Sequence, residues 1–381
     1  MNIVFVPHGY APSVGGAQAY TRGLAESVVR LGHTVCVVVP DVSDPEAFYA
    51  TGYPAIGTPR ETINGVTVDR LPYDVTRHGA TRRAEARILS RALHRFNRTL
   101  DRRLAFLQPD AVVTLPHVFP NVEAVLASRH RDDWPVVYAP LLHENDPNWP
   151  TDRVAGAVSA ADAVIALTTH ERERLIESYG ADERTTEVTP PGVAAPAVWS
   201  ARREEPIVLA LGRRVRSKRV EAIYEAMGIV WGTTPAARLV IAGAPAAHGP
   251  DPAASMASDP RVTVIEAVDD RRRSQLIASA RVVVSASVVE SFGITTLEAW
   301  AHGTPVVVAD TPVSRSVVRD EVDGLITPAS PAALAAAIEL MLADPEIGER
   351  MGTAGRARVE TDFTWDRSGS ALLGLLDRAT R

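Results

Sequence analysis

The feature that most constrains the fold is a segment in which a strand, a loop, a helix and a second strand follow one another. Residues 281–287 and 304–310 are rich in valine, as buried strands are. The residues between them favour a helix that Gly293 opens and Gly303 closes. The segment therefore predicts a strand–loop–helix–strand unit.

Two carboxylates fall within this unit. Glu290 lies on the loop, and Glu298 lies about one turn into the helix. Partial positive charge collects at a helix N-terminus, so the amides of residues 293–296 are expected to bind an anion such as phosphate. Glycosidase carboxylates lie roughly 5–9.5 Å apart, whereas eight mostly helical residues span about 12 Å. Two interpretations remain: an ordinary βαβ unit with exposed glutamates, or a carboxylate for sugar hydroxyls and another for ribose hydroxyls, with a diphosphate between them.

This stretch resembles the Glu-x7-Glu motif of the retaining glycosyltransferases of family four. The likeness extends to the flanking sequences Ser-Phe-Gly-Ile and Ala-Trp-Ala-His-Gly-Thr-Pro-Val-Val. It implies an α/β protein of the GT-B fold, with two Rossmann-like domains whose parallel sheets face each other across a cleft. The residues that it implies for donor binding in this stretch are Phe292, Gly293, Ile294, Thr295 and Glu298.

Length and composition favour two globular domains. The chain has 381 residues, of which 46% are hydrophobic and 23% charged, and its net charge of −6 gives no reason to expect nucleic acid. Cys36 is the only cysteine, which excludes an intrachain disulfide and fits a reducing cytoplasm. The N-terminus enters a strand without the charged region of a signal peptide, and no apolar run approaches the ~20 residues of a membrane span.

The first half alternates between strands and helices, which predicts an open parallel sheet covered on both faces. The loop after the first strand carries Gly15 and Gly16, where glycines let backbone approach a ligand closely. In the family, a Pro-x-x-Gly-Gly loop lies under the donor diphosphate at this place. His117 and His143 follow two later strands, and the likeness implies that His117 reaches the transferred sugar. A structural role for either histidine stays open.

A basic amphipathic helix is expected over residues 82–103. Its arginines recur at roughly helical spacing, with apolar residues between them. Such a helix could contact anionic lipid, as a peripheral protein at the inner membrane face would, or a negatively charged acceptor. It could equally be a solvated face in an arginine-rich sequence.

The second half contains a basic loop. The family's Gly-Arg-x-x-x-x-Lys sequence assigns Arg213 and Lys218 to the donor diphosphate. Lys218 is also the only lysine among 40 basic residues, which indicates a site that needs a compact ammonium rather than a planar guanidinium. Arg219 stands where relatives usually carry glycine, so we expect a crowded turn there.

Other positions follow from the resemblance alone. Val268 falls at the position where relatives bind the nucleobase, mainly through backbone groups. Pro191 and Ser316 depart from the family pattern, the latter near an acceptor-proximal glutamate. The predicted domains are 1–195, with a C-terminal helix over about 366–381 crossing back to it, and 203–364.

These observations predict transfer of a glycosyl group from a nucleoside-diphosphate sugar, UDP- or GDP-linked, to a hydroxyl acceptor. Lys218, Arg213 and the helix amides would stabilise charge on the leaving diphosphate. No Asp-x-Asp sequence occurs, so no metal site and no further cofactor are expected. Two alternatives remain open. One is a sugar phosphorylase with pyridoxal phosphate on Lys218, and the other is a catalytically silent nucleotide-sugar-binding subunit.

Overall fold

The computed structural model describes residues 1–13, 15–116, 120–143, 146, 149–194, 196, 205–245, 250–266 and 268–379. The chain divides into two compact units. Unit 1 comprises Met1–Leu142, Asn148–Gly192 and Trp365–Arg381, and unit 2 comprises His143–Pro147 and Val193–Thr364. The expected domain limits at residues 195 and 203 lie outside the described residues.

Unit 1 is built on an eight-stranded sheet. Neighbouring strands pair in parallel, except for the edge strand β3, which pairs antiparallel with β4. In sheet order the strands are β3 (Arg60–Ile63), β4 (Val66–Leu71), β2 (Thr34–Pro40), β1 (Asn2–Pro7), β5 (Ala111–Leu115), β6 (Val136–Tyr138), β7 (Ala163–Ala166) and β8 (Thr186–Val188).

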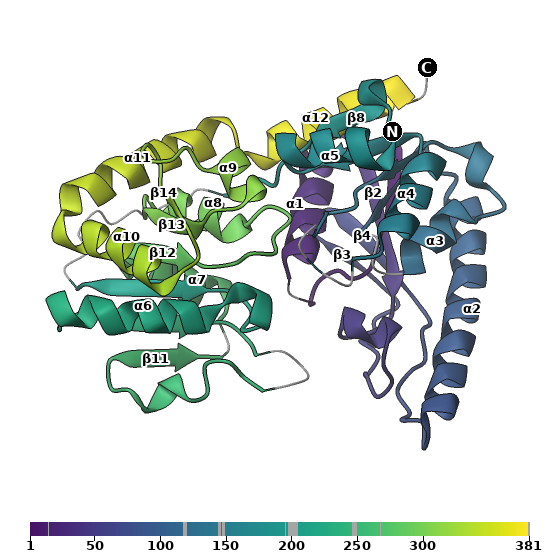
Figure 1. The fold of residues 1–381 in the computed structure, drawn as a ribbon. Helices are drawn as coiled ribbons and strands as arrows, with labels where there is room; N and C mark the ends of the chain where they lie inside the picture. Colours follow the sequence, from purple (N-terminus) through teal and green to yellow (C-terminus); the bar gives the residue numbers. More distant parts are fainter. Residues whose placement is uncertain are drawn as a thin grey trace. The chain divides into compact units, whose positions relative to one another are not determined.

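The helices of unit 1 pack around this sheet (Figure 1). They are α1 (Gly16–Arg30), α2 (Arg82–Leu107), α3 (Pro120–Leu126), α4 (Thr151–Ala160), α5 (Thr169–Tyr179) and α12 (Trp365–Ala379). The C-terminal α12 lies against α1, where Gly23 makes room for the ring of Trp365: a Cβ on Gly23 would stand 2.1 Å from it. Arg30 and Asp366 close the same contact with an ion pair of 2.7 Å.

Unit 2 is built on a six-stranded sheet that is parallel throughout. In sheet order the strands are β11 (Val262–Ile265), β10 (Arg238–Ala242), β9 (Ile207–Leu211), β12 (Val282–Ser285), β13 (Val306–Ala309) and β14 (Leu325–Thr327). The helices are α6 (Val220–Thr233), α7 (Asp270–Ser279), α8 (Ile294–Ala301), α9 (Pro312–Val317), α10 (Pro331–Ala343) and α11 (Pro345–Thr361).

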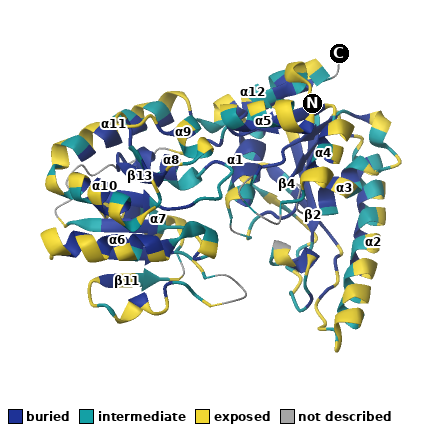
Figure 2. Cartoon of the chain, in the orientation of Figure 1, coloured by how far each residue is buried: buried dark blue, intermediate teal, exposed yellow. Residues whose placement is uncertain are grey.

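The strands form the core of each unit because helices cover both faces of a mostly parallel sheet. Ile3, Val4, Phe5 and Val6 are consecutive in β1, and all four are fully buried. This explains why the strands appear in the sequence as continuous apolar runs rather than as alternating patterns. Figure 2 shows the central strands buried and the outer side of α2 exposed.

One sheet element differs from the expectation of a purely parallel sheet. The antiparallel β3 and β4 form a hairpin joined by Asn64 and Gly65, whose φ angles are 49° and 83°. Positive φ at both positions is typical of the tight turn whose twist matches a hairpin, and Asn-Gly is its preferred sequence.

Each sheet has a point where the chain reverses the direction in which it adds strands. In unit 1 this point lies between β1 and β5, and in unit 2 between β9 and β12. The loops that leave two such neighbouring strands run to opposite sides, which opens a crevice at their C-terminal ends. Ligands of open α/β sheets bind in this crevice.

Candidate active site

The switch point of unit 2 brings the two main predicted polar residues together. Lys218 ends a short 3₁₀ helix (Arg216–Lys218) beyond β9, and Glu290 lies in the loop beyond β12. The ammonium of Lys218 contacts Oε1 of Glu290 as a hydrogen-bonded ion pair. The side chains are 29% and 22% exposed, so the pair is sheltered yet open to a ligand. The backbone of Ser217 also accepts a hydrogen bond of 3.3 Å from Val288, which joins the two loops.

The first turn of α8 faces the same place. Gly293 immediately precedes the helix with φ 84° and ψ 56°, a left-handed conformation that favours glycine. The Thr296 amide donates to the Gly293 carbonyl at 2.9 Å, so it is already satisfied. The predicted anion site thus loses one of its four donors, and the amides of Gly293, Ile294 and Thr295 remain for a ligand.

These groups line one pocket of unit 2. It contains about 310 Å³ of empty space, part of it open to solvent. Its polar lining includes Lys218, Ser285, Glu290, Thr295 and Thr296, and Gly293 lies beside them. A cation, a carboxylate and a helix N-terminus therefore converge at the crevice of the sheet, where a charged and hydroxyl-rich ligand would be held.

The basic loop contributes two further arginines. Arg213 is exposed, and its guanidinium makes no hydrogen bond to a described residue, so it is available to an anion. Arg219 adopts φ 50° and ψ 44° between the 3₁₀ turn and α6. This left-handed conformation is costly for a residue with a Cβ. The turn is therefore strained, as expected where relatives carry glycine.

Glu298 lies on α8 and forms an ion pair with Arg273 of α7, with 2.7 Å between Oε1 and Nη1. Burial raises the pKa of Glu298 above its ordinary value, and the Arg273 guanidinium acts in the opposite direction. Sequence reasoning missed Arg273. The available sequence signal was the run Arg271-Arg272-Arg273, which directly follows the segment predicted to bind the base.

Phe292 and Val268 have different surroundings. The Phe292 side chain is buried and packs edge-on against Phe363, with 5.9 Å between ring centroids. It therefore supports the loop, and a ligand would meet its backbone. Val268 lies in the connection between β11 and α7, at the C-terminal end of an outer strand of the sheet.

In unit 1, Gly15 and Gly16 stand at the beginning of α1, beyond β1 and beside the switch point. A Cβ on Gly15 would come within 2.4 Å of Gln18, whereas a Cβ on Gly16 would meet nothing within 4 Å. The chain thus leaves open space at Gly16. His117, predicted at the end of the neighbouring β5, lies outside the described residues.

His143 is grouped with unit 2. Burial lowers its pKa, and the charges of Glu290 and Lys218 act on it in opposite directions. The imidazole therefore lies within electrostatic range of the central ion pair. A neutral imidazole can both donate and accept a hydrogen bond, which suits contact with hydroxyl groups.

Arg214 is a second residue that sequence reasoning missed. Its side chain is fully buried and forms an ion pair of 2.7 Å with Asp251. It also donates a short hydrogen bond to the Gly243 carbonyl. The buried side chain of Arg214 therefore holds the basic loop against Asp251 and Gly243, whereas the side chain of its neighbour Arg213 is exposed.

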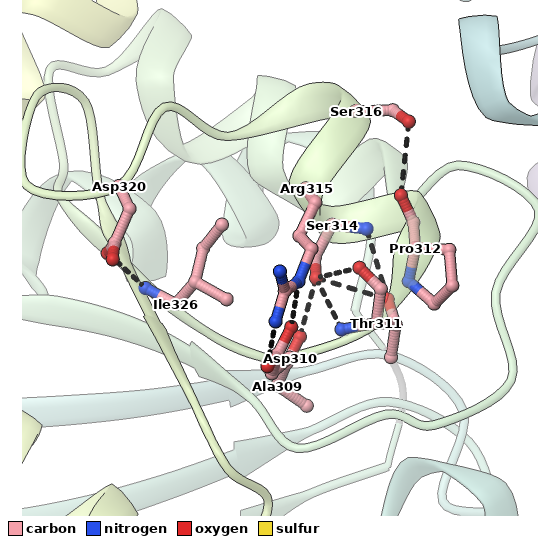
Figure 3. Close-up of polar contacts among 9 residues, drawn as sticks. All are labelled: Ala309, Asp310, Thr311, Pro312, Ser314, Arg315, Ser316, Asp320 and Ile326. Carbon is pink, nitrogen blue, oxygen red and sulfur yellow. Dashed lines mark hydrogen bonds and ion pairs between the residues drawn. The ribbon is translucent and has the colours of Figure 1, made fainter.

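The loop beyond β13 differs from the family pattern, and Figure 3 shows its contacts. Arg315 binds Asp310 with two hydrogen bonds of 2.5 and 2.6 Å, and Thr311 and Ser314 cap α9 reciprocally. Ser316 stands in place of the expected glutamate, and its hydroxyl donates to the Pro312 carbonyl at 3.0 Å. No carboxylate occupies this position. Across the described residues, no cluster of three or more histidine, cysteine or acidic side chains is arranged to hold a metal ion.

Two family models match adjoining parts of the chain. The model for Glycosyltransferase Family 4 matches residues 14–195, and that for Glycosyl transferases group 1 matches residues 195–358. The chain is similar to a D-inositol 3-phosphate glycosyltransferase of Nocardia farcinica, with 31% identity over 64% of this chain and 61% of the relative. It thus spans about three fifths of that relative's length. The protein of the same description from Xylanimonas cellulosilytica is 27% identical over 96% of this chain and 92% of its own.

Solved structures share the fold. Sucrose-phosphate synthase from Thermosynechococcus elongatus superposes with a TM-score of 0.80 at 22% identity, covering 100% of this chain and 98% of its own. Anabaena Alr3699/HepE in complex with UDP-glucose gives a TM-score of 0.76 at 16% identity, with 99% of both chains covered. Together with the two parallel-dominated sheets, these likenesses confirm the predicted α/β architecture of the GT-B type.

Proposed function

The chain belongs to the family four glycosyltransferases, and from this premise we propose that it transfers a glycosyl group from a nucleoside-diphosphate sugar to a hydroxyl acceptor. The transfer retains the anomeric configuration and needs no metal ion. The single observation that carries the proposal is the convergence of Lys218, Glu290 and the first turn of α8 at the switch point of unit 2.

The chemistry of these groups matches the charges that develop during transfer. Negative charge grows on the diphosphate as the glycosidic bond breaks, and preorganised donors lower the barrier most when they face that charge. Lys218, Arg213 and the amides of Ile294 and Thr295 supply such donors. Glu290 orients the sugar through its hydroxyls. The role of His117 toward the transferred sugar rests on the family resemblance alone, because this residue lies outside the described part of the chain.

The other donor contacts follow the same division. Glu298 accepts hydrogen bonds from ribose hydroxyls, and the backbone near Val268 receives the base. Solved neighbours carry UDP-glucose in HepE and ADP in Starch Synthase IV. We propose a UDP- or GDP-linked sugar for this chain and a small molecule, glycan or lipid-linked hydroxyl as the acceptor.

A thermal-shift series with UDP, GDP, ADP and dTDP tests the donor site, because a ligand that binds only the folded state raises the melting temperature by mass action. The base that gives the largest shift then enters an assay for nucleoside diphosphate released from its sugar. A shift with sugar-dependent release supports the transferase. Binding without release under a broad acceptor screen would instead favour the silent binding subunit.

The exposed arginines of α2 support peripheral binding of the protein to the cytoplasmic face of a membrane. Arg83, Arg87, Arg91, Arg98 and Arg102 follow one another at helical spacing, and all are exposed. None of them forms an ion pair with a described residue. We propose that this row contacts anionic lipid headgroups, since each arginine near such a surface contributes about 1 kcal/mol. Within the described residues, no helix is long and apolar enough to cross a bilayer.

Flotation with vesicles tests this contact. The protein should float with vesicles of phosphatidylglycerol and phosphatidylcholine, and it should not float with phosphatidylcholine alone. A variant in which Arg87, Arg91 and Arg98 become Gln should lose the binding.

The matched control removes three exposed arginines elsewhere, by changing Arg271, Arg272 and Arg350 to Gln. Because both variants lose the same charge, equal loss in both would mean that net charge, and not α2, governs the attraction. Binding to DNA in place of vesicles would contradict the lipid surface.

A further inference from the structure

Three consecutive arginines on α7 have different surroundings. Arg271 and Arg272 are exposed, whereas Arg273 is partly buried and contacts Glu298 of α8. The distance from Arg273 Nη1 to Glu298 Oε1 is 2.7 Å, and the two side chains are 28% and 17% exposed. Only the third arginine of the run therefore contacts α8.

The next residue of α7 makes a second contact with α8. Ser274 Oγ lies 2.6 Å from His302 Nε2, and His302 Nδ1 lies 2.8 Å from the backbone oxygen of Glu298. Arg273 and Ser274 thus hold α8 at Glu298 and one turn later. Contacts to both the side chain and the backbone oxygen of Glu298 therefore hold it in place.

The ion pair also governs the charge of Glu298. Burial is the largest influence and raises the pKa of Glu298, while Arg273 lowers it and Asp270 raises it. Both charged neighbours are on α7. Without Arg273, burial and Asp270 would act together, and the carboxyl group would hold its proton to a higher pH.

The position of α7 connects this pair with the base. The helix begins at Asp270, directly after the segment that contains Val268, and Asp269 caps its N-terminus by accepting a hydrogen bond of 2.6 Å from the Arg272 amide. The segment predicted to bind the base therefore leads directly into α7, and the first turn of α7 carries Arg273, the partner of Glu298.

We propose that Arg273 is a positioning residue, which through its ion pair holds the Glu298 carboxylate where it accepts hydrogen bonds from the ribose hydroxyls of the donor. The inference rests on the proposed function, since it assigns the ribose to Glu298. It makes nucleotide affinity depend on a residue of α7 that need not touch the nucleotide.

A double-mutant cycle measured by calorimetry with UDP, and with GDP in parallel, tests the proposal. Glu298→Gln and Arg273→Gln should each weaken binding roughly tenfold or more, as expected for lost hydrogen bonds to a charged group. The double variant should bind no more weakly than Glu298→Gln alone. If the two losses multiply, Arg273 contacts the nucleotide itself, for which its buried and unbonded Nε would be available, and the positioning role is overturned.

The pH dependence separates positioning from simple structural damage. Affinity of Arg273→Gln for UDP should rise with pH as Glu298, whose pKa is raised further without the guanidinium, loses its proton, whereas the affinity of the native protein should already be complete at a lower pH. Glu298→Gln cannot show this rise. Arg273→Lys, which keeps a cation, should retain part of the affinity and provides the test if Arg273→Gln folds poorly. The control is Arg272→Gln, which removes the adjacent exposed charge and should bind as the native protein does.

The outcomes distinguish this inference from the proposed function. If the native protein binds neither nucleotide, the proposed function fails. If the native protein binds and Glu298→Gln weakens binding while Arg273→Gln binds normally at every pH, the positioning role fails and the transferase remains.

Discussion

The ammonium of Lys218 is hydrogen-bonded to the carboxylate of Glu290, although 72 residues separate them in the sequence. The contact joins the cation assigned to the diphosphate with the acid assigned to the sugar. Each group is thereby held in place before a donor arrives, and the pair has no net charge. On the proposed assignment, a diphosphate that enters would give the ammonium a second anionic partner and leave Glu290 facing the sugar.

The first prediction concerns Lys218. If it neutralises charge on the departing diphosphate, its effect is larger in the transition state than in the ground state. We expect Lys218→Ala to lower turnover by roughly a hundredfold or more, on the order of 3 kcal/mol. Lys218→Arg keeps the charge but brings a wider planar group beside Arg219, and should show an intermediate defect. The measurement is turnover at saturating donor and acceptor. If Lys218→Arg turned over at the native rate, the presence of a single lysine would no longer support a catalytic role for its ammonium.

The second prediction separates the two glutamates. Glu298→Ala should weaken the free nucleoside diphosphate as well as the donor, because both contain ribose. Glu290→Ala should leave nucleotide affinity unchanged or higher, since it releases Lys218 from its partner, and it should chiefly lower turnover. Calorimetry with the nucleoside diphosphate and steady-state rates distinguish the two effects. Equal losses of nucleotide affinity in both variants would refute the assignment.

The strands of the sheets were largely predictable from the sequence, because valine-rich buried runs bounded by glycine and proline leave few alternatives. The strands expected within residues 281–287 and 304–310 are β12 and β13 of the structure. The missed strand β3 is short and half exposed, so its apolar pattern is weak. The Asn64-Gly65 turn was the available signal for it.

Pairs of side chains were much harder to predict. Lys218 and Glu290 meet only because β9 and β12 are neighbours, an order that no local pattern contains. Arg214 and Asp251 likewise depend on how the loops beyond β9 and β10 lie. Motif resemblance assigned roles to single residues, whereas their partners Arg273 and Asp251 follow from sheet order and packing.

A third prediction concerns metal ions. In the proposed site the diphosphate faces Lys218, Arg213 and helix amides, and these groups would offset its charge without a divalent cation. Transfer should proceed with little loss in excess EDTA. The control is the same assay with added magnesium or manganese, and activity that returns only with one of these ions would overturn the leaving-group model.

The fourth prediction concerns the anchor of the basic loop. Arg214→Met should destabilise the fold by about 3 kcal/mol, because it leaves Asp251 without its buried partner. Arg214 lowers the pKa of Asp251, so the ion pair contributes fully above about pH 4 and its contribution disappears as the pH falls further. Urea denaturation at neutral and acidic pH measures both effects. Adding Asp251→Leu should recover part of the loss, and a double variant as unstable as Arg214→Met would contradict the ion-pair explanation.

The last prediction uses the strained turn at Arg219. Its φ of 50° costs roughly 1–2 kcal/mol for a residue with a Cβ, whereas glycine adopts such an angle freely. Glycine loses more chain entropy on folding, so Arg219→Gly should stabilise the protein by a net of about 0.5–1 kcal/mol. The matched control is Arg216→Gly in the preceding 3₁₀ turn, where φ is not positive and glycine should destabilise. Urea denaturation compares the two, and a loss of stability in both would mean that the Arg219 side chain contributes more than its backbone strain costs.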